Sequence, residues 1–300
     1  METLEYRRFA EFCDACSRYR YIGLCYGTPG VGKTLSARRY ANWDKVQTFW
    51  NHQCRTKALL KEISKCTAAF YTSPVVGSPG YLERDISKSR SLLHNAGIER
   101  ARRYEAARTK RLFHRAEALR DPKRNPDGYQ SAEAFDVENA FHEQRNRSLQ
   151  VTSAVSDPTA LLIIDEADRL KEVGLEQVRS IFDHGGIGLV LIGMPGIEKR
   201  LARYPQFYSR IGFVHEFRTL VAAEVRQLLE QDWMPPGVNL PHQPWDSEAV
   251  ATIIRMTGGN FRLLNRLLTQ MERILEINGL QEVTKAVVEA ARESLVIGEA

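Results

Sequence analysis

Short apolar runs alternate with helix-like stretches over the first 220 residues of the chain. Five runs have strand character because they are apolar, short and bounded by turn-forming residues; they span 21–26, 68–72, 160–164, 187–192 and 213–217. Continuous apolar runs of this kind are typical of parallel strands that are covered on both faces. The pattern predicts an α/β fold, with a parallel five-stranded sheet between helices, followed by a small C-terminal helical lid.

The same pattern divides the chain into three regions. We expect a leading helix over 1–20, an α/β domain over 21–220, and a lid over 221–300 with helices at 222–233, 246–257, 261–278 and 284–295. Inside the α/β domain, a helix at 55–64 and a turn-rich loop at 73–79 flank the second strand. The interval 80–158 is helical and charged, and two prolines with a glycine between 121 and 128 interrupt it.

Composition limits the class of protein. The chain has 43% apolar residues, enough for a core, and no run of eighteen apolar residues, so we expect no membrane span. The N-terminus lacks the apolar stretch of a secretory signal, which predicts a cytoplasmic protein. Cys13 and Cys16 form one C-x-x-C, which we interpret as two buried thiols on a helix face; a metal or redox site is the alternative.

The first chemical motif follows the first strand. Residues 27–34 match G-x-x-x-x-G-K-[ST] between a strand and a helix, the context in which this spacing forms a phosphate-binding loop (P-loop). Glycines let successive backbone N–H groups turn toward phosphates at the positive end of a helix. We therefore expect ATP with Mg²⁺ as cofactor, bound by Gly27, Thr28, Pro29, Gly30, Val31, Gly32, Lys33, Thr34 and Leu35.

The second motif is an apolar strand that ends in two carboxylates, Asp165 and Glu166. Asp165 and Thr34 are the predicted Mg²⁺ ligands, and Lys33 is expected to reach the β- and γ-phosphates. Glu166 is placed to orient or deprotonate the water that attacks the γ-phosphate. Two acids at the start of the next helix would also stabilise the positive N-terminal end of that helix. This purely structural role is the alternative to catalysis for Asp165 and Glu166.

These motifs, in their order, resemble those of AAA+ ATPases. The P-loop, the Asp-Glu strand, the strand end Leu191-Ile-Gly-Met-Pro195 and the stretch Thr257-Gly-Gly-Asn-Phe-Arg262 are similar to transposition-helper ATPases of the TniB/TnsC and MuB kind. The resemblance covers roughly residues 6–295, apart from 80–158. It implies an oligomeric, DNA-binding ATPase that selects or marks target DNA and recruits or activates a transposase.

The resemblance also implies roles for three further positions. Arg262 falls where the family has an arginine that contacts the γ-phosphate from the lid. Arg210 falls where an arginine finger acts on ATP held by a neighbouring subunit, with Arg203 as the rival. Met194 departs from the family, because relatives have Asn, Thr or Ser there to hold the attacking water, and a thioether is a poor hydrogen-bonding group. Either a different side chain holds that water, or hydrolysis is slow.

Positive charge is concentrated in one segment. Between 99 and 124 basic residues outnumber acidic ones by six, whereas the whole chain has a net charge of +5. Each Lys or Arg that neutralises a phosphate adds affinity without sequence information, so we expect sequence-independent binding to double-stranded DNA. The predicted contacts lie on one long helix and on a loop before it: Arg100, Arg102, Arg103, Lys110 and Arg111 on the helix, and Arg84, Lys88 and Arg90 on the loop.

The alternative for this segment is a solvated helix with intrahelical ion pairs. At the level of function, the chain is expected to assemble with itself as a ring or helical filament and to act with a transposase and possibly a target-selector protein, without a membrane. A replication-initiator or clamp-loader-like ATPase is the alternative within the superfamily. A signalling or defence switch that gates a protein partner without touching DNA is the alternative of another class.

Overall fold

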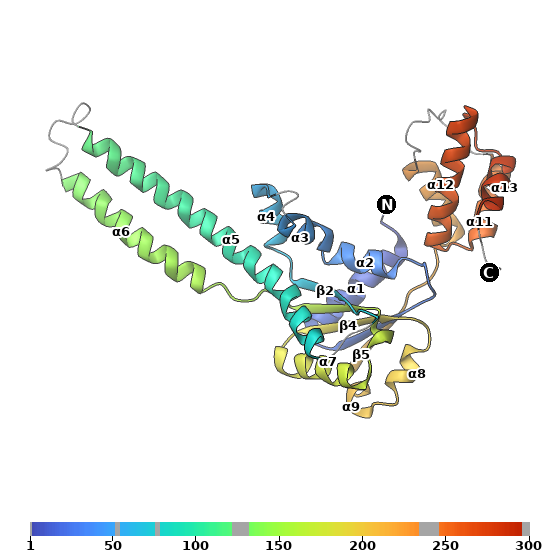
Figure 1. Cartoon of the computed structure of the whole chain (residues 1–300), viewed down its shortest axis with the longest axis horizontal. Helices are drawn as coiled ribbons and strands as arrows, with labels where there is room; N and C mark the ends of the chain where they lie inside the picture. Colours follow the sequence, from blue (N-terminus) through green and yellow to red (C-terminus); the bar gives the residue numbers. More distant parts are fainter. Residues whose placement is uncertain (1, 52–54, 76–78, 122–131, 234–245, 296–300) are drawn as a thin grey trace. The chain divides into compact units, whose positions relative to one another are not determined.

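The computed structural model describes residues 2–51, 55–75, 79–121, 132–233 and 246–295 (Figure 1). Two compact units are present. The first comprises residues 1–37, 72–76 and 163–300, and the second comprises residues 38–71 and 77–162. None of the helices in the described ranges combines the length and the apolar composition that crossing a membrane requires.

Five strands form one sheet in the order β2-β3-β4-β1-β5. Their bounds are β1 (Ile22–Tyr26), β2 (Ala68–Thr72), β3 (Leu161–Asp165), β4 (Gly188–Gly193) and β5 (Ile211–Glu216). β1 pairs in parallel with β4, Leu24 opposite Leu191, and with β5, Leu24 opposite Val214. Every residue of β3 and β4 is buried, as expected of inner strands. The predicted fold class is confirmed.

The leading helix α1 (Leu4–Tyr19) packs on β1, β4 and β5 in the first unit. It begins at Thr3, whose side chain accepts a hydrogen bond from the Tyr6 N–H at 3.1 Å. Phe12 and Cys16 approach β1 so closely that a Cβ on Gly23 would lie 2.3 Å from the Cys16 sulfur. Only glycine fits there, so the sequence of β1 allows this helix to lie directly on the sheet.

Cys13, Cys16 and Cys25 are buried and free in this packing. Burial raises the pKa of the Cys16 thiol to about 12, which leaves it protonated at neutral pH. Among the described residues, no group of three or more His, Cys, Asp or Glu side chains is arranged to hold a metal ion. The interpretation of Cys13 and Cys16 as core thiols therefore agrees with their surroundings.

The remaining helices of the first unit flank the strands or form the lid. They are α2 (Lys33–Tyr40), whose last residues belong to the second unit, α7 (Glu172–Gly185), α8 (Ile197–Leu201), α9 (Pro205–Tyr208), α10 (Ala222–Gln227), α11 (Ser247–Thr257), α12 (Phe261–Asn278) and α13 (Lys285–Glu293). The lid helices α10 to α13 share one core, in which Leu264, Leu267 and Met271 of α12 are buried. The C-terminal helices that the sequence pattern predicted after the sheet are thus present, and the domain boundary at 221 stays a prediction.

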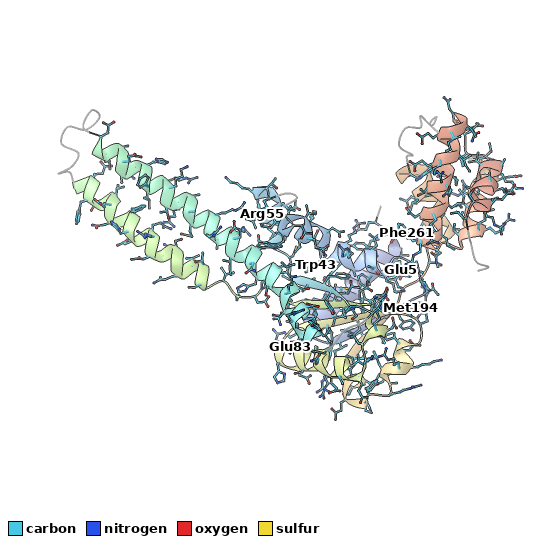
Figure 2. All side chains as sticks on the ribbon, in the orientation of Figure 1. Glu5, Trp43, Arg55, Glu83, Met194 and Phe261 are labelled. Carbon is cyan, nitrogen blue, oxygen red and sulfur yellow. The ribbon has the colours of Figure 1, made fainter. Side chains whose placement is uncertain are left out.

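The second unit contains β2, α3 (Trp43–Trp50), α4 (Lys57–Ile63), α5 (Pro79–Arg120) and α6 (Ala132–Ser153). The ring centroids of Trp43 and Phe70 lie 6.3 Å apart, and the Arg55 guanidinium lies 5.7 Å from the centroid of the Phe49 ring. Figure 2 labels Trp43 and Arg55 among the side chains of this unit. Helices α5 and α6 lie side by side over most of the length of α6 (Figure 1). The α3 helix was not predicted, because the sequence pattern placed no helix between Asn42 and Arg55.

Two polar contacts fix the register of the α5–α6 hairpin. Gln144 donates to the Glu105 carboxylate, and both side chains are buried. His94 makes a 2.7 Å hydrogen bond with the Val155 carbonyl. Buried polar groups that satisfy each other allow only one alignment of the two helices, because any other leaves them unpaired.

The position of α5 corrects one prediction. Arg84, Lys88 and Arg90 were expected on a loop, but α5 begins at Pro79 and includes all three. Proline suits the first position of a helix because its φ is preset and its missing N–H is not needed there. The helix therefore begins before Arg84, and the three basic residues lie on it. Residues 76–78 and the predicted break at 122–128 lie outside the described residues.

Candidate active site

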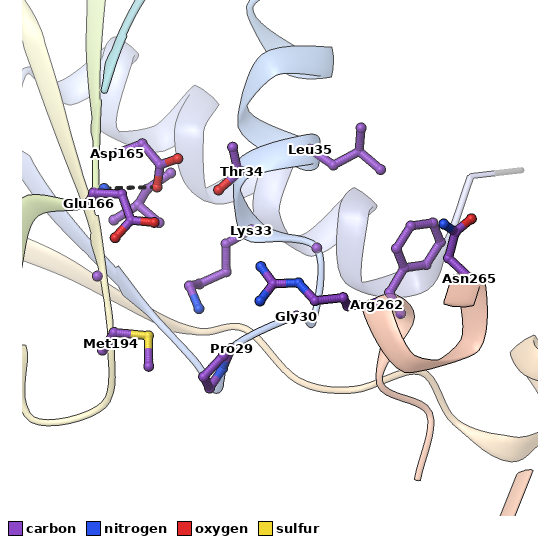
Figure 3. A pocket seen from close by; sticks show the side chains of 14 residues that line it. Pro29, Gly30, Lys33, Thr34, Leu35, Asp165, Glu166, Met194, Arg262 and Asn265 are labelled. Atoms are coloured by element: carbon purple, nitrogen blue, oxygen red, sulfur yellow. Dashed lines mark hydrogen bonds between the residues drawn. The ribbon is translucent and has the colours of Figure 1, made fainter. Parts of the chain in front are cut away.

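The P-loop residues surround a cavity of about 360 Å³ in the first unit (Figure 3). Pro29, Gly30, Gly32, Lys33, Thr34 and Leu35 line it. Lys33 donates to the carbonyl oxygens of Gly27 at 2.5 Å and Thr28 at 2.9 Å. Gly27 and Thr28, which were also predicted to bind the nucleotide, therefore hold the lysine side chain. Val31 is buried instead. The loop and the first turn of the helix after it therefore border the same cavity.

Asp165 lies at the end of β3 with only 3% of its surface exposed. Burial raises the pKa of its carboxyl, while hydrogen bonds from Thr34 and from the Glu166 N–H, at 2.9 Å, oppose that shift. A hydroxyl and a carboxylate held together are oxygen ligands, and Mg²⁺ is typically bound by one or two such groups together with phosphates and waters. The residues present therefore fit the magnesium ion that the P-loop implies.

Glu166 adopts a left-handed backbone conformation, with φ at 55°. Its side chain is partly exposed, lines the cavity, and lies 3.6 Å from the Arg169 guanidinium. Arg169 also donates to the Ser73 carbonyl at 2.9 Å. A positive φ in a residue other than Gly, Asn or Asp costs energy and persists only where the surroundings impose it. Here it turns the Glu166 carboxylate out of the strand and toward the cavity.

The lid closes the opposite side of the cavity. Phe261, Arg262 and Asn265 of α12 line it, and Figure 3 shows Arg262 across from Lys33. The structure thus brings Arg262 to the P-loop although 228 residues separate it from Thr34 in the sequence. Of the four predicted catalytic residues, Lys33, Glu166 and Arg262 line one cavity.

Met194 follows β4 and also lines the cavity, with 37% of its surface exposed. Its N–H donates to both carboxylate oxygens of Asp168 at 3.0 Å. A Cβ on Gly193 would lie 2.8 Å from the same carboxylate. Asp168 therefore fixes the end of β4 through the main chain, while the thioether offers the cavity no strong hydrogen-bonding group.

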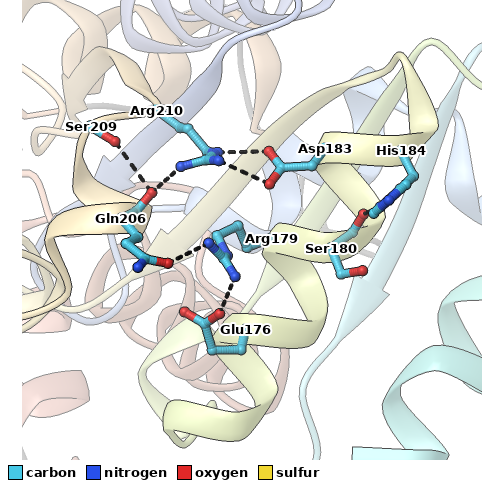
Figure 4. Close-up of polar contacts among 8 residues, drawn as sticks. All are labelled: Glu176, Arg179, Ser180, Asp183, His184, Gln206, Ser209 and Arg210. Atoms are coloured by element: carbon cyan, nitrogen blue, oxygen red, sulfur yellow. Dashed lines mark hydrogen bonds and ion pairs between the residues drawn. The ribbon is translucent and has the colours of Figure 1, made fainter.

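Arg210 does not line this cavity. Its guanidinium forms a bidentate ion pair with Asp183 of α7, at 2.6 and 3.0 Å, and donates to the Gln206 carbonyl (Figure 4). The rival Arg203 is exposed. Neither arginine lines the cavity of its own chain, and the choice between them stays a prediction.

Side-chain partners divide the basic residues of α5 into two groups. Arg90 pairs with Asp157 at 2.7 Å, and Arg102 and Arg103 both pair with Glu99, at 2.9 and 2.7 Å. Arg84 lies 4.6 Å from the Tyr81 ring, and Arg100 donates to the Ser64 hydroxyl. Within the described part of α5, some exposed cations have neither an ion pair nor a side-chain hydrogen bond; they are Lys88, Arg108, Lys110 and Arg111.

Sequence reasoning missed three residues of the lid side, namely Asn260, Phe261 and Asn265. Asn260 is the N-cap of α12, and its side chain donates to the Pro29 carbonyl at 2.8 Å. An Asn directly before a helical apolar stripe is a recognisable helix start. The sequence therefore indicates that Asn260 caps the helix, but no local feature of the sequence indicates its contact with the P-loop.

Comparison with known proteins supports this arrangement. Residues 16–201 match the family model described as an AAA domain. A Staphylococcus aureus protein described as a potential ATP-binding protein is 40% identical over 305 residues, covering 99% of this chain and 97% of that protein. The Haemophilus influenzae protein named Mu-like prophage FluMu DNA transposition protein B is 27% identical over 144 residues, 46% of this chain and 48% of that protein.

Two solved structures are similar in fold. The Thermotoga maritima RuvB Holliday junction branch migration motor has a TM-score of 0.54 and 14% identity, and the match covers 99% of this chain and 73% of RuvB. The Aeropyrum pernix ORC1 protein in complex with DNA has a TM-score of 0.50 and 19% identity, with 97% and 64% covered. At these identities the likeness concerns the fold alone, and it agrees with the strands, P-loop and lid described above.

Proposed function

This chain belongs to the AAA domain family and is an ATPase, and we propose that it uses ATP to assemble on double-stranded DNA and to present that DNA to a transposase. The observation that carries the ATPase part is the single cavity lined by Lys33, Glu166 and Arg262. The resemblance to DNA transposition protein B supports the transposition part. The unpaired cations of α5 support the DNA part.

In this proposal each residue of the cavity has a role in phosphoryl transfer. The P-loop N–H groups and Lys33 bind the phosphates, and Thr34 and Asp165 hold Mg²⁺. Bound there, the ion would neutralise the charge that develops on the phosphates. Glu166 orients the attacking water and accepts its proton, and Arg262 stabilises the γ-phosphate from the lid.

Slow turnover is part of the proposal. Met194 offers no strong hydrogen bond to the attacking water, and Glu166 is paired with Arg169. An ATPase with these features suits a timing switch that stays on DNA until it hydrolyses its nucleotide. We propose that assembly or DNA binding accelerates hydrolysis, because a finger from a neighbouring copy completes the site.

The DNA surface that we propose is the exposed part of α5 that carries Lys88, Arg108, Lys110 and Arg111. Arg90, Arg102 and Arg103 are satisfied by carboxylates of the second unit, so a phosphate would have to compete with those partners. Unpaired exposed cations have no such competitor and release counterions on binding. They are therefore the stronger candidates among the basic residues of α5.

The decisive test measures duplex binding with ATP at several salt concentrations. Replacing Lys88, Arg108, Lys110 and Arg111 with Ala is expected to weaken binding for all sequences and to lower the slope of log affinity against log salt by about 0.9 for each phosphate that is no longer neutralised. A matched control removes four exposed lid cations, Arg255, Arg273, Lys285 and Arg292. If the α5 variant keeps the wild-type slope, the DNA surface is not on α5; if the wild type binds no duplex at low salt, the DNA function is wrong.

A further inference from the structure

The lid helix α12 begins directly against the P-loop in the first unit. The Asn260 Oδ1 caps the helix by accepting from the N–H groups of Arg262 at 3.1 Å and Leu263 at 3.3 Å. The Nδ2 of the same side chain donates to the Pro29 carbonyl at 2.8 Å, and the Arg262 N–H also donates to the Gly30 carbonyl at 2.9 Å. Two consecutive P-loop carbonyls thus accept hydrogen bonds from the lid.

Gly30 shows how close this contact is. Its φ is +86°, and a Cβ at this position would lie 2.5 Å from Asn260 Oδ1 and 2.8 Å from the Arg262 Cβ. Any side chain would therefore meet both backbone strain and a clash with the lid. Position 30 is one of the four variable positions of the P-loop motif, so the phosphate-binding spacing alone does not require glycine here. The positive φ and the contact with the lid do.

The contact has a consequence for the groups that bind phosphate. A trans peptide is planar, so the N–H of one residue points opposite to the carbonyl of the residue before it. Because the Pro29 carbonyl is turned to Asn260, the N–H of Gly30 points away from the lid contact. The Gly30 carbonyl, held by the Arg262 N–H, orients the N–H of Val31 in the same manner. Gly30 lines the cavity and Val31 is the buried residue between it and Gly32, so both N–H groups belong to the loop that is expected to bind phosphate.

We propose that Asn260 is a positioning residue for the nucleotide phosphates: its amide holds the P-loop peptides in the phosphate-binding orientation and couples docking of the lid to nucleotide binding. This inference rests on the ATPase function of the same cavity. The coupling is reciprocal, because docking of the lid raises nucleotide affinity by the same factor by which bound nucleotide favours the docked lid.

The test uses the full chain with Asn260→Ser and Asn260→Asp. Serine and aspartate are both good N-caps, so α12 keeps its start. Serine is too short to reach the Pro29 carbonyl, and aspartate has no Nδ2–H to donate. The dissociation constants of Mg-ATP and Mg-ADP are measured by calorimetry. Loss of one hydrogen bond is expected to raise both constants about fivefold in the serine variant, and more in the aspartate variant, whose charge repels phosphates.

Two further measurements separate positioning from general stability. The thermal midpoint of the nucleotide-free Asn260→Ser variant is expected to stay within about 2 °C of the wild type, because the cap is retained. Hydrogen exchange of residues 261–278 is expected to slow when ATP binds the wild type, and to slow much less in the variant. A purely structural role would not alter this response to nucleotide.

The matched control is Asp246→Ser. Asp246 caps α11, another lid helix, by accepting from the Glu248 N–H at 3.2 Å. Wild-type affinity in this control supports the proposal. Wild-type affinity in both Asn260 variants overturns it, and so does an equal loss in the control, which would mean that any weakened lid helix has the same effect. If the wild type itself binds no ATP, the proposed ATPase function is wrong. That result differs from the two outcomes that overturn only the role of Asn260.

Discussion

Glu166 combines three properties that suit a general base. It borders the cavity, it follows the buried Asp165, and its φ of 55° directs its side chain away from the strand. The Arg169 guanidinium 3.6 Å away holds the carboxylate and is itself tied to the Ser73 carbonyl. A partly exposed ion pair of this kind is weak and can be exchanged for a water or a phosphate-bound partner.

Replacing Glu166 with Gln is therefore expected to leave ATP affinity within about twofold of the wild type while turnover falls by about 100-fold or more. The amide keeps the size of the side chain but cannot accept the proton of the attacking water. Steady-state hydrolysis and equilibrium ATP binding, measured on the same preparation, check both parts. Glu172→Gln, at the exposed start of α7, is the control. Unchanged turnover in the Glu166 variant would remove its catalytic role.

At the scale of elements, the packing of α1 on β5 buries a titratable group. His215 lies 5.4 Å from the Phe12 ring and 5.8 Å from the Phe217 ring. Burial, together with the nearby Arg8 and Arg218, lowers the pKa of its imidazole to about 4. Its Nε2 has no hydrogen-bond partner, so the 3.4 Å approach to Glu5 is not an ion pair at neutral pH. The α1–β5 contact thus requires neutral His215.

This contact predicts a pH dependence of stability. Between the ordinary pKa of His, about 6.5, and about 4 in the folded protein, only the unfolded chain binds the proton. The free energy of unfolding therefore loses up to about 1.4 kcal/mol per pH unit through this group as pH falls. Burial raises the pKa of Glu5, which acts in the opposite direction. The difference in the pH dependence of the free energy of unfolding between wild type and His215→Phe gives the contribution of the histidine.

Chemical denaturation at pH 7 and pH 5 measures that difference. The wild type is expected to lose more stability than His215→Phe on acidification, and His184→Gln, a change at an exposed histidine, is expected to behave as the wild type does. Equal losses in wild type and His215→Phe would show that the imidazole is not the group that titrates.

For the whole molecule, the proposed function predicts that an arginine of a neighbouring copy completes the site. Arg210 is held by Asp183 and Gln206 within its own chain, whereas Arg203 is exposed. An arginine finger that acts in trans makes hydrolysis a property of the assembly. The Arg210–Asp183 ion pair would then have to open on assembly.

Mixing two inactive variants tests this arrangement. Arg210→Ala keeps an intact cavity, and Glu166→Gln keeps an intact finger, so neither alone is expected to hydrolyse ATP. Mixed in equal amounts in random order, they form competent interfaces at about a quarter of positions and regain up to that share of wild-type turnover. A second mixture contains Arg203→Ala in place of Arg210→Ala and is otherwise identical. Recovery only with Arg203→Ala would assign the finger to Arg203, and recovery with neither would exclude action in trans by these two arginines.

The sequence by itself determined the fold class and the phosphate half of the site. Residues 27–34 and 161–166 are contiguous motifs, and a contiguous motif fixes its own backbone geometry through local hydrogen bonds and glycine conformations. The apolar runs located the strands to within about one or two residues, because burial on both faces demands apolar side chains in inner strands such as β3 and β4. The start of α5 was misjudged, since turn-forming residues are compatible with both a loop and a helix N-terminus.

Only the tertiary structure decided which distant side chains meet. Asn260 and Arg262 reach the P-loop across more than 220 residues, Asp183 engages Arg210, and Asp157 engages Arg90 across 67 positions. These pairings follow from how packed elements bring surfaces together. No local spacing encodes that choice, because each of these residues could satisfy its hydrogen bonds with water or with several other partners.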